Sequence, residues 1–162
     1  MKKLKIYLDT SVISHLDVAD VPDKMEDTRK LWEDIRNGKF EVYISPIAVL
    51  ELDNCPEPKR SLITKWLQSI SYTLLQETDE VLELAMQYLR AGILPKKSAR
   101  DRQHIAYACV YNCDMIVSWN FEHMVNYKTI SGVKGVNALS GYKEMPIYSP
   151  TMIILGGADD DT

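Results

Sequence analysis

Short apolar runs alternate along this sequence with segments in which apolar residues recur at helical spacing. The apolar runs predict strands at residues 6–8, 40–45, 72–76, 114–119 and, as a final or edge strand, 147–155. Helices are expected between them at residues 22–37, 46–54, 59–70, 79–91, 101–112 and, more weakly, 135–145. Because strands that alternate with helices form a parallel sheet covered on both faces, the fold class is α/β.

The length of 162 residues, with 46% hydrophobic and 26% charged residues, fits one globular domain with a single core. We expect this domain at residues 1–155, followed by a disordered Gly- and Asp-rich tail at residues 156–162. No apolar run approaches the roughly 20 residues that span a membrane. The apolar run after the basic N-terminus is broken by Asp9 and is too short for a signal peptide, so a cytoplasmic location is expected.

The three cysteines, Cys55, Cys109 and Cys113, are an odd number without a secretory context, which predicts reduced thiols. Cys109 and Cys113 are four residues apart on a predicted helix, a spacing that can chelate a metal. No second pair at zinc-site spacing accompanies them. We therefore interpret them as small core residues.

Polar side chains of metal-binding types fall where the predicted strands end. Asp9 directly follows the first strand, Asn120 follows the strand at 114–119, and Glu51 lies one or two turns into the helix after the second strand. Asp101 begins the helix that precedes strand 114–119. This helix runs antiparallel to its strand, so its N-terminus lies at the edge where the strand ends. We expect all four residues at this carboxyl edge, whereas Asp114 begins its strand at the opposite edge.

Three carboxylates at one sheet edge repel one another, and this repulsion destabilises the fold. A bound Mg²⁺ or Mn²⁺ ion offsets the repulsion, because these ions prefer carboxylate oxygen and water as ligands. We therefore predict Asp9, Glu51 and Asp101 as metal ligands. The neighbouring hydroxyls of Thr10 and Ser11 are predicted to orient the Asp9 carboxylate.

Taken singly, each of these residues also has an interpretation without function. The alternatives are Asp9 and Asp101 as helix N-caps, Glu51 as a solvated helix residue, and Asn120 and His123 as turn or packing residues. The functional interpretation depends on the combination of residues.

Four segments resemble, in order and spacing, the successive motifs of the PIN-domain family. They are YLDTSVI with Asp9, SPIAVLEL with Glu51, RDRQHIAYA with Asp101 and DMIVSWNFEH with Asn120, and the resemblance extends from about residue 4 to about residue 150. It implies a three-layer α/β/α fold with a parallel sheet of five strands, and Mg²⁺- or Mn²⁺-dependent cleavage of single-stranded or structured RNA. Many similar bacterial proteins are the toxin halves of VapBC-type toxin–antitoxin pairs and form homodimers, so an antitoxin is also implied as a partner.

One position departs from the family pattern, because many members have a fourth acid where this chain has Asn120. An amide oxygen can ligate a metal or orient a metal-bound water, but it brings no charge. We therefore expect one tightly bound metal, with a second recruited by substrate phosphate. The alternative is a catalytically weak or inactive PIN-like module that binds RNA or protein.

The formal net charge of −4 predicts no overall attraction to nucleic acid, so RNA binding requires a local basic patch. The segment PKKSARDR places such a patch around Asp101. We predict that its basic residues bind phosphates that flank the cleaved bond; they are Lys96, Lys97, Arg100 and Arg102. The alternative is a solvated loop before a helix.

Two other classes of protein also have an Asp after an apolar strand. A phosphatase of the haloacid dehalogenase type has a second Asp two residues later, where this chain has Ser11. A receiver-like signalling domain has a Lys after its final strand, and residues 147–155 contain none. Both classes therefore fit less well than a metal-dependent nuclease.

Overall fold

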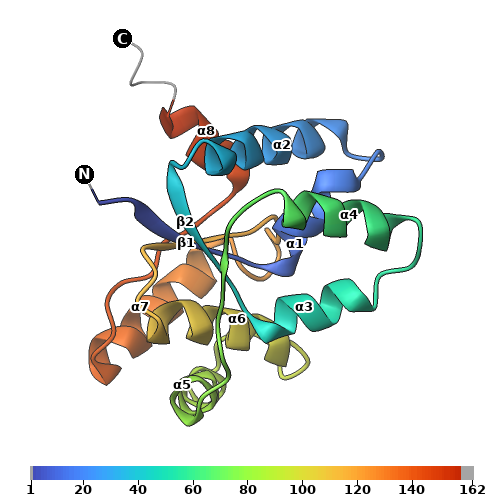
Figure 1. Cartoon of the computed structure of the whole chain (residues 1–162). Helices are drawn as coiled ribbons and strands as arrows, with labels where there is room; N and C mark the ends of the chain where they lie inside the picture. Colours follow the sequence, from blue (N-terminus) through green and yellow to red (C-terminus); the bar gives the residue numbers. More distant parts are fainter. Residues whose placement is uncertain (1, 158–162) are drawn as a thin grey trace.

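Five parallel strands form one sheet, in the order β3-β2-β1-β4-β5. Figure 1 labels the neighbouring strands β1 and β2. The computed structural model describes residues 2–157 of the chain. The strands are β1 (Leu4–Leu8), β2 (Phe40–Ile44), β3 (Thr73–Leu74), β4 (Met115–Val117) and β5 (Ile147–Tyr148). The order places β1 at the centre of the sheet, with β2 and β4 as its two neighbours.

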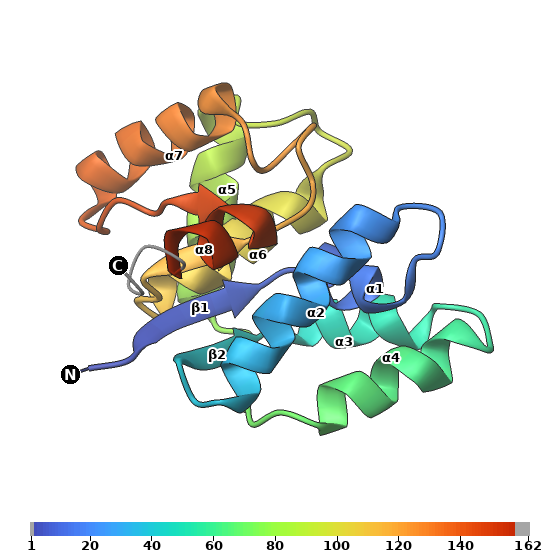
Figure 2. The ribbon, with the colours of Figure 1, turned by 90° about the horizontal axis from the view of Figure 1, so that it is seen from above.

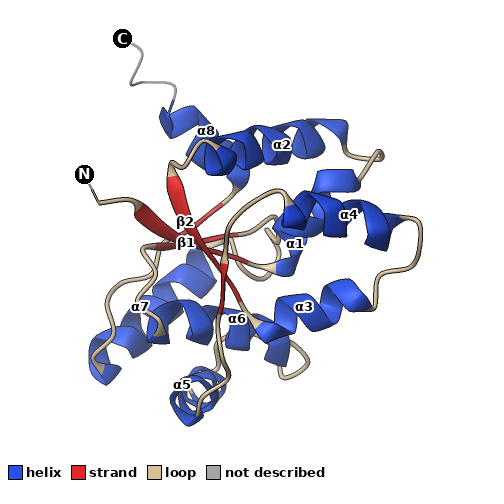
Figure 3. Ribbon diagram, viewed as in Figure 1, coloured by secondary structure: helices blue, strands red, loops and turns tan. Residues whose placement is uncertain are grey.

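Helices cover both faces of the sheet, which gives the predicted three-layer α/β/α fold (Figure 3). They are α1 (Thr10–Ser14), the 3-10 helix η1 (His15–Asp17), α2 (Pro22–Arg36), α3 (Pro46–Asp53), α4 (Lys59–Gln68), α5 (Asp79–Arg90), α6 (Ala99–Val110), α7 (Tyr127–Ser140) and α8 (Pro150–Gly157).

The two faces of the sheet bury separate apolar clusters, and alternate strand residues belong to one or the other. Tyr7 of β1 and Ile116 of β4 pack in the cluster formed with α5, α6 and α7. Ile6, Leu8 and Val117 pack in the cluster formed with α1, α2 and α4, against which α8 also lies. Figure 2 shows α8 beside α2 on this face. Burial on both faces explains why the strands have continuous apolar runs.

Residues at the ends of several elements act as the sequence predicts. The hydroxyl of Ser45 caps α3 by accepting from the Ala48 N–H at 3.4 Å. The backbone of Gly92, directly after the C-cap of α5, has a φ of 76°, which glycine adopts without strain. At the opposite edge of the sheet from the predicted site, the Asp114 carboxylate accepts from the Lys5 N–H at 2.7 Å.

The C-terminal part differs from the prediction, because residues 149–155 form no strand. Only Ile147 and Tyr148 pair with β4, and α8 then begins at Pro150. Proline favours the first turn of a helix, where its missing N–H leaves no hydrogen bond unmade. Gly156 and Gly157, predicted to start a disordered tail, end α8, and the rest of that predicted tail lies outside the described residues.

Four helical segments also differ from the prediction. The short helix α1 and the 3-10 helix η1 were not expected, and α6 lies two residues earlier than predicted. Helix α7 spans Tyr127–Ser140 instead of residues 135–145. It starts early because the Asn126 side chain caps it, accepting from the Thr129 N–H at 2.9 Å.

Two further expectations concern thiols and membranes. All three cysteines are free thiols, with Cys109 and Cys113 buried and Cys55 partly buried. Within residues 2–157, no helix combines the length and the apolar character needed to cross a membrane.

Candidate functional site

The carboxyl ends of β1 and β4 form the point where the strand order of the sheet reverses. From β1, the chain continues on one side to β2 and β3 and on the other side to β4 and β5. Ligands of open parallel sheets bind at such a switch point. The ends are joined directly, because the Asp9 N–H donates to the Val117 carbonyl at 3.3 Å.

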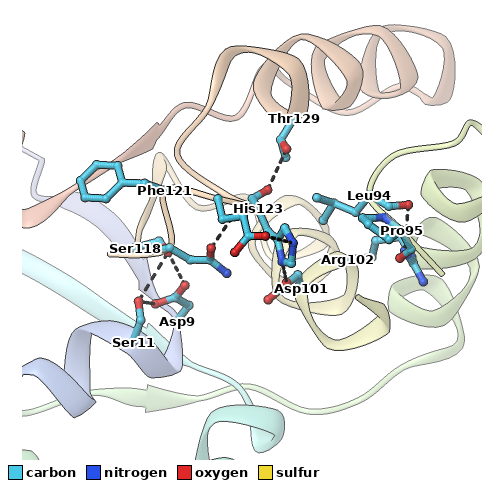
Figure 4. Close-up of polar contacts among 12 residues, drawn as sticks. Asp9, Ser11, Leu94, Pro95, Asp101, Arg102, Ser118, Phe121, His123 and Thr129 are labelled. Atoms are coloured by element: carbon cyan, nitrogen blue, oxygen red, sulfur yellow. Dashed lines mark hydrogen bonds and ion pairs between the residues drawn. The ribbon is translucent and has the colours of Figure 1, made fainter. Parts of the chain in front are cut away.

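Asp9 is buried at this point, with 4% of its surface exposed. Its carboxylate accepts from the Ser11 hydroxyl at 2.5 Å and from the Ser118 hydroxyl (Figure 4). As the N-cap of α1, it also accepts from the Val12 N–H at 3.4 Å. Burial raises the pKa of the Asp9 carboxyl, and the attraction of His104 and these hydrogen bonds oppose that rise without cancelling it. The site therefore holds a buried carboxylate whose charge is incompletely compensated.

Glu51 lies on α3, half-buried, and accepts two hydrogen bonds on one oxygen. Thr10 Oγ1 donates to Oε1 at 2.8 Å and His104 Nε2 lies 3.0 Å from the same oxygen, while the Arg100 guanidinium is 3.9 Å from Oε2. Burial alone would raise the pKa of Glu51, but the His104 and Thr10 hydrogen bonds and the nearby positive charges outweigh it and lower the pKa. Thr10, predicted to orient Asp9, thus orients Glu51 instead.

His104 is a buried partner of Glu51 that the sequence interpretation did not identify. Its exposed fraction is 3%, and because a carboxylate only accepts, Nε2 carries the proton in the contact with Glu51. The Tyr7 hydroxyl is hydrogen-bonded to Nδ1 and also to the Ser45 hydroxyl, the latter at 2.8 Å. The available signal was spacing: His104 lies three residues after Asp101, on the same side of a helix.

Asp101 lies in the first turn of α6 and contacts His123, with Oδ2 3.1 Å from the ring atom Nδ1. The backbone N–H of His123 donates to Asn120 Oδ1 at 2.9 Å, and the backbone N–H of Asn120 donates to Ser118 Oγ at 3.0 Å. Asn120 therefore forms a side-chain turn, the structural role considered for it, and that turn positions His123. Because Ser118 also binds Asp9, these contacts connect Asp9 to Asp101 (Figure 4).

Two further contacts connect Glu51 to residues that neighbour Asp9 and Asp101 in the sequence. Thr10, the neighbour of Asp9, contacts Glu51, and Arg100, the neighbour of Asp101, reaches Glu51 from the other direction. Hydrogen bonds thus connect Asp9, Asn120 and Asp101 at the carboxyl edge of the sheet, and Thr10 and Arg100 link Glu51 to residues that neighbour Asp9 and Asp101 in the sequence. We call this set of contacts the polar network. Their roles in metal binding and catalysis stay a prediction.

The donor atoms of this network suit Mg²⁺ or Mn²⁺, since the carboxylates supply hard oxygen ligands and the buried Asp9 charge is incompletely compensated. Their positions are less favourable. Among residues 2–157, no three His, Cys, Asp or Glu side chains form a group that could hold a metal ion. Glu51 is held by Thr10 and His104, and Asp101 contacts His123. Direct binding of one ion by all three carboxylates therefore requires side-chain movement.

Three of the four predicted phosphate-binding residues are exposed near Asp101: Lys96, Lys97 and Arg100. Their position leaves the prediction open. Arg102 differs, because only 3% of it is exposed and its guanidinium donates to the backbone carbonyls of residues 93–96 at 2.7–3.4 Å. The prediction that Arg102 binds substrate phosphate is therefore wrong, since its guanidinium is buried and its two Nη atoms donate to carbonyls inside the protein.

A five-stranded parallel sheet between two layers of helices, with a polar network at its switch point, is a PIN-like α/β arrangement. A similar solved structure is that of VapBC2 from Rickettsia felis, bound to a DNA fragment from the promoter. It matches with a TM-score of 0.57 at 12% identity, over 90% of this chain and 98% of that chain. PAE2754 from Pyrobaculum aerophilum matches with a TM-score of 0.53 at 14% identity, over 96% of this chain and 90% of the other.

At these identities the likeness concerns the fold, and it confirms the PIN-like fold expected from the sequence. No protein-family model matches the chain, and no curated protein matches it significantly in sequence.

Proposed function

We propose that this protein is a divalent-metal-dependent endoribonuclease. The observation that carries the proposal is the single polar network that joins Asp9, Glu51, Asp101 and Asn120 at the switch point of a PIN-like sheet. Asp9, Glu51 and Asp101 would bind Mg²⁺ or Mn²⁺, directly or through water. The bound ion would supply an activated water and neutralise charge that develops on the phosphate.

The surrounding side chains have supporting roles in this proposal. His104 holds the Glu51 carboxylate in place through a contact of 3.0 Å, and Ser11 fixes the rotation of the Asp9 carboxylate. Asn120 positions a water or the substrate. Lys96, Lys97 and Arg100 bind flanking phosphates, which compensates locally for the acidic character of the whole chain. Hydrolysis by an activated water needs no protein nucleophile.

The proposed biological role is the toxin half of a type II toxin–antitoxin pair in the cytoplasm. Two findings support it: the sequence resemblance to VapC-like proteins and the fold likeness to VapBC2. The partners in this proposal are RNA, a cognate antitoxin and a second copy of the chain.

The test is cleavage of a mixed panel of labelled RNAs by purified protein with Mn²⁺ or Mg²⁺. We expect cleavage that EDTA abolishes and that Asp101→Asn reduces by more than about 100-fold, because loss of even an indirect partner of a metal costs about 10–100-fold. Asp53→Asn, which alters an exposed carboxylate on the same helix as Glu51, should cleave normally. Cleavage that persists in EDTA and in Asp101→Asn would contradict the proposal.

A second candidate function is a binding module for RNA or protein on a nuclease fold. The observation in its favour is that Glu51 and Asp101 are held by other side chains and that no three-residue metal group is formed among residues 2–157. RNA or protein binding without cleavage, together with no measurable Mn²⁺ binding, would favour this function.

Replacing Asn120 with aspartate is expected to strengthen Mn²⁺ binding by about tenfold, because the charge of the ligand set tunes the affinity of such sites. One oxygen of the new carboxylate can still accept from the His123 N–H, so the local turn is retained. Isothermal titration calorimetry with Mn²⁺ measures the change. Asn54→Asp adds the same charge at the C-cap of α3 and serves as the control. Equal affinities for Asn120→Asp and the unmodified protein would place residue 120 outside the metal site.

A further inference from the structure

A cavity of about 1000 Å³ opens beside the polar network. The loop between α5 and α6 forms one wall, with Ile93, Leu94 and Pro95, and the segment from residue 122 to residue 132 forms the other. His123 belongs to both the cavity and the network, because it lines the cavity and its ring lies 3.1 Å from Asp101. In Figure 4, His123 lies between Ser118 on one side and the Leu94–Pro95 segment on the other. The cavity therefore adjoins the candidate active site at His123.

Both walls of the cavity are fixed by internal contacts. The buried Arg102 guanidinium holds four successive carbonyls of residues 93–96, and Leu94 has a φ of 68°, a left-handed conformation that non-glycine residues rarely adopt. On the other wall, the Thr129 hydroxyl donates to the His123 carbonyl at 2.7 Å (Figure 4). Cavities whose walls are fixed before binding lose less entropy when a ligand enters.

The two walls also approach each other closely at Gly132 of α7. A Cβ atom added at Gly132 would lie 3.1 Å from the Ile93 side chain, which is tighter than ordinary packing. Glycine at this position therefore lets the helix approach the loop. This contact between Gly132 and Ile93 fixes the distance between α7 and the α5–α6 loop at this point.

The lining of the cavity combines apolar side chains with an aromatic ring and a cation. Ile93, Leu94 and Pro95 supply apolar surface, and Tyr127 is 85% exposed. Lys128 also lines the cavity, and the exposed Lys96 follows the lining residue Pro95 in the sequence. Unpaired nucleobases bind to proteins by stacking on aromatic rings, while their phosphates bind cations.

The acidic side chain in the lining also suits a nucleobase. Glu122 lines the cavity, and its carboxylate can accept a hydrogen bond from the exocyclic amino group of a base. Phe121, an exposed aromatic residue just before this segment, is partly covered, because Lys24 Nζ lies 5.1 Å from its ring centroid. Tyr127 is the more accessible ring for stacking.

We propose that this cavity binds one unpaired nucleobase of the RNA, from a nucleotide next to the cleaved phosphate, with the base stacked on Tyr127. The inference rests on the proposed function and extends it, because it names the single-stranded substrate feature that the protein recognises. An apolar peptide side chain is a poorer occupant, since Lys128 and His123 line the cavity and His123 contacts Asp101 of the network proposed to cleave RNA.

The first test locates the base by photocrosslinking. Ten-nucleotide single-stranded RNAs, each with one 5-iodouridine at a different position, are irradiated with the full-length protein in EDTA, so that no cleavage occurs, and the crosslinked peptide is mapped by mass spectrometry. We expect a crosslink at Tyr127 for a subset of iodouridine positions. Crosslinks confined to Phe121 or to other surfaces would overturn the inference.

The second test uses kinetics on an RNA that the unmodified protein cleaves. Tyr127→Ala is expected to raise KM roughly tenfold with little change in kcat, because stacking of one base contributes about 1–3 kcal/mol and acts on binding. Tyr127→Phe should keep the original KM, since the ring is retained. Tyr72→Ala removes an exposed aromatic residue from the far edge of the sheet and should have no effect. An unchanged KM in Tyr127→Ala would contradict the inference.

The two proposals fail in different ways. If the unmodified protein neither cleaves nor crosslinks any RNA, the proposed ribonuclease function fails, and the nucleobase site fails with it. If the protein cleaves RNA but Tyr127→Ala behaves like Tyr72→Ala and no crosslink maps to the cavity, only the nucleobase site fails. Because Tyr127 is largely exposed, its replacement is not expected to unfold the protein.

Discussion

Replacing Asp9 with asparagine is expected to reduce RNA cleavage more than about 100-fold while making the metal-free protein more stable. Burial raises the pKa of the Asp9 carboxyl, so the charged form of this side chain costs folding free energy. Asparagine removes this charge and keeps an oxygen that can accept from Ser11 and from the Val12 N–H. The same charge is the one that a bound metal would compensate, so stability and activity should change in opposite directions.

Thermal unfolding with EDTA and with Mn²⁺ measures both effects. The unmodified protein should gain about 5–10 °C in Tm when Mn²⁺ is present at 100 times its Kd. Asp9→Asn should start from a higher Tm in EDTA and lose most of the Mn²⁺ gain. Asp20→Asn, which alters an exposed carboxylate, is the control and should follow the unmodified protein. A lower Tm in EDTA for Asp9→Asn, or an undiminished Mn²⁺ gain, would show that Asp9 is a structural cap only.

The central strands could be predicted because their residues are buried on both faces. Ile6, Tyr7 and Leu8 point alternately to two apolar layers, so β1 appears in the sequence as a continuous apolar run that ends at Asp9. Once β1 and β4 are parallel neighbours, the positions of Asp9 and Asn120 follow from the direction of the chain. The edge location of the predicted residues therefore depends on backbone topology alone.

The segment IYSPTMIIL shows where this reasoning is insufficient. A short apolar run can be a buried strand or a buried helix, and periodicity does not distinguish the two. Here Ile153 and Ile154 pack as helix residues in the cluster that contains α2. The dipeptide Ser149-Pro150 was the available signal, because Ser45-Pro46 begins α3 in the same way and was interpreted correctly.

Side-chain partners within the site could not be predicted, because they depend on how helices pack against one another. Thr10 is adjacent to Asp9 in the sequence, yet it donates to Glu51 because α1 packs against α3. His104 reaches Glu51 across the space between α6 and α3. The spacing of residues along one helix does not predict contacts between different helices.

The role of Arg102 depends on the side of α6 to which its side chain projects. Arg100 and Arg102 are two residues apart on α6, so they project to different sides of the helix. Arg100 is exposed and lies 3.9 Å from Glu51, whereas Arg102 points inward to the carbonyls of residues 93–96. A local run of basic residues such as RDR predicts neither direction.

Replacing Arg102 with methionine is therefore expected to destabilise the protein strongly, and Arg100→Met is the matched control. Methionine retains apolar bulk but leaves carbonyls of the loop without their charged donor, at a cost of about 3 kcal/mol. For a chain of this size that corresponds to a Tm lower by roughly 6–12 °C. Arg100→Met should change the Tm by no more than about 2 °C, because the side chain is exposed and its ion pair is long.

Amide hydrogen exchange of the Arg102→Met protein then separates this explanation from a phosphate-binding role. Faster exchange should be concentrated in residues 93–98, whose backbone the guanidinium holds. Arg102→Met could instead keep the Tm and the exchange pattern, and only weaken RNA binding and reduce the dependence of the affinity on salt concentration. The guanidinium of Arg102 would then have to be available to phosphate. Loss of the loop conformation would also remove one wall of the cavity, so weaker RNA binding that accompanies faster exchange of this loop is an expected result of Arg102→Met.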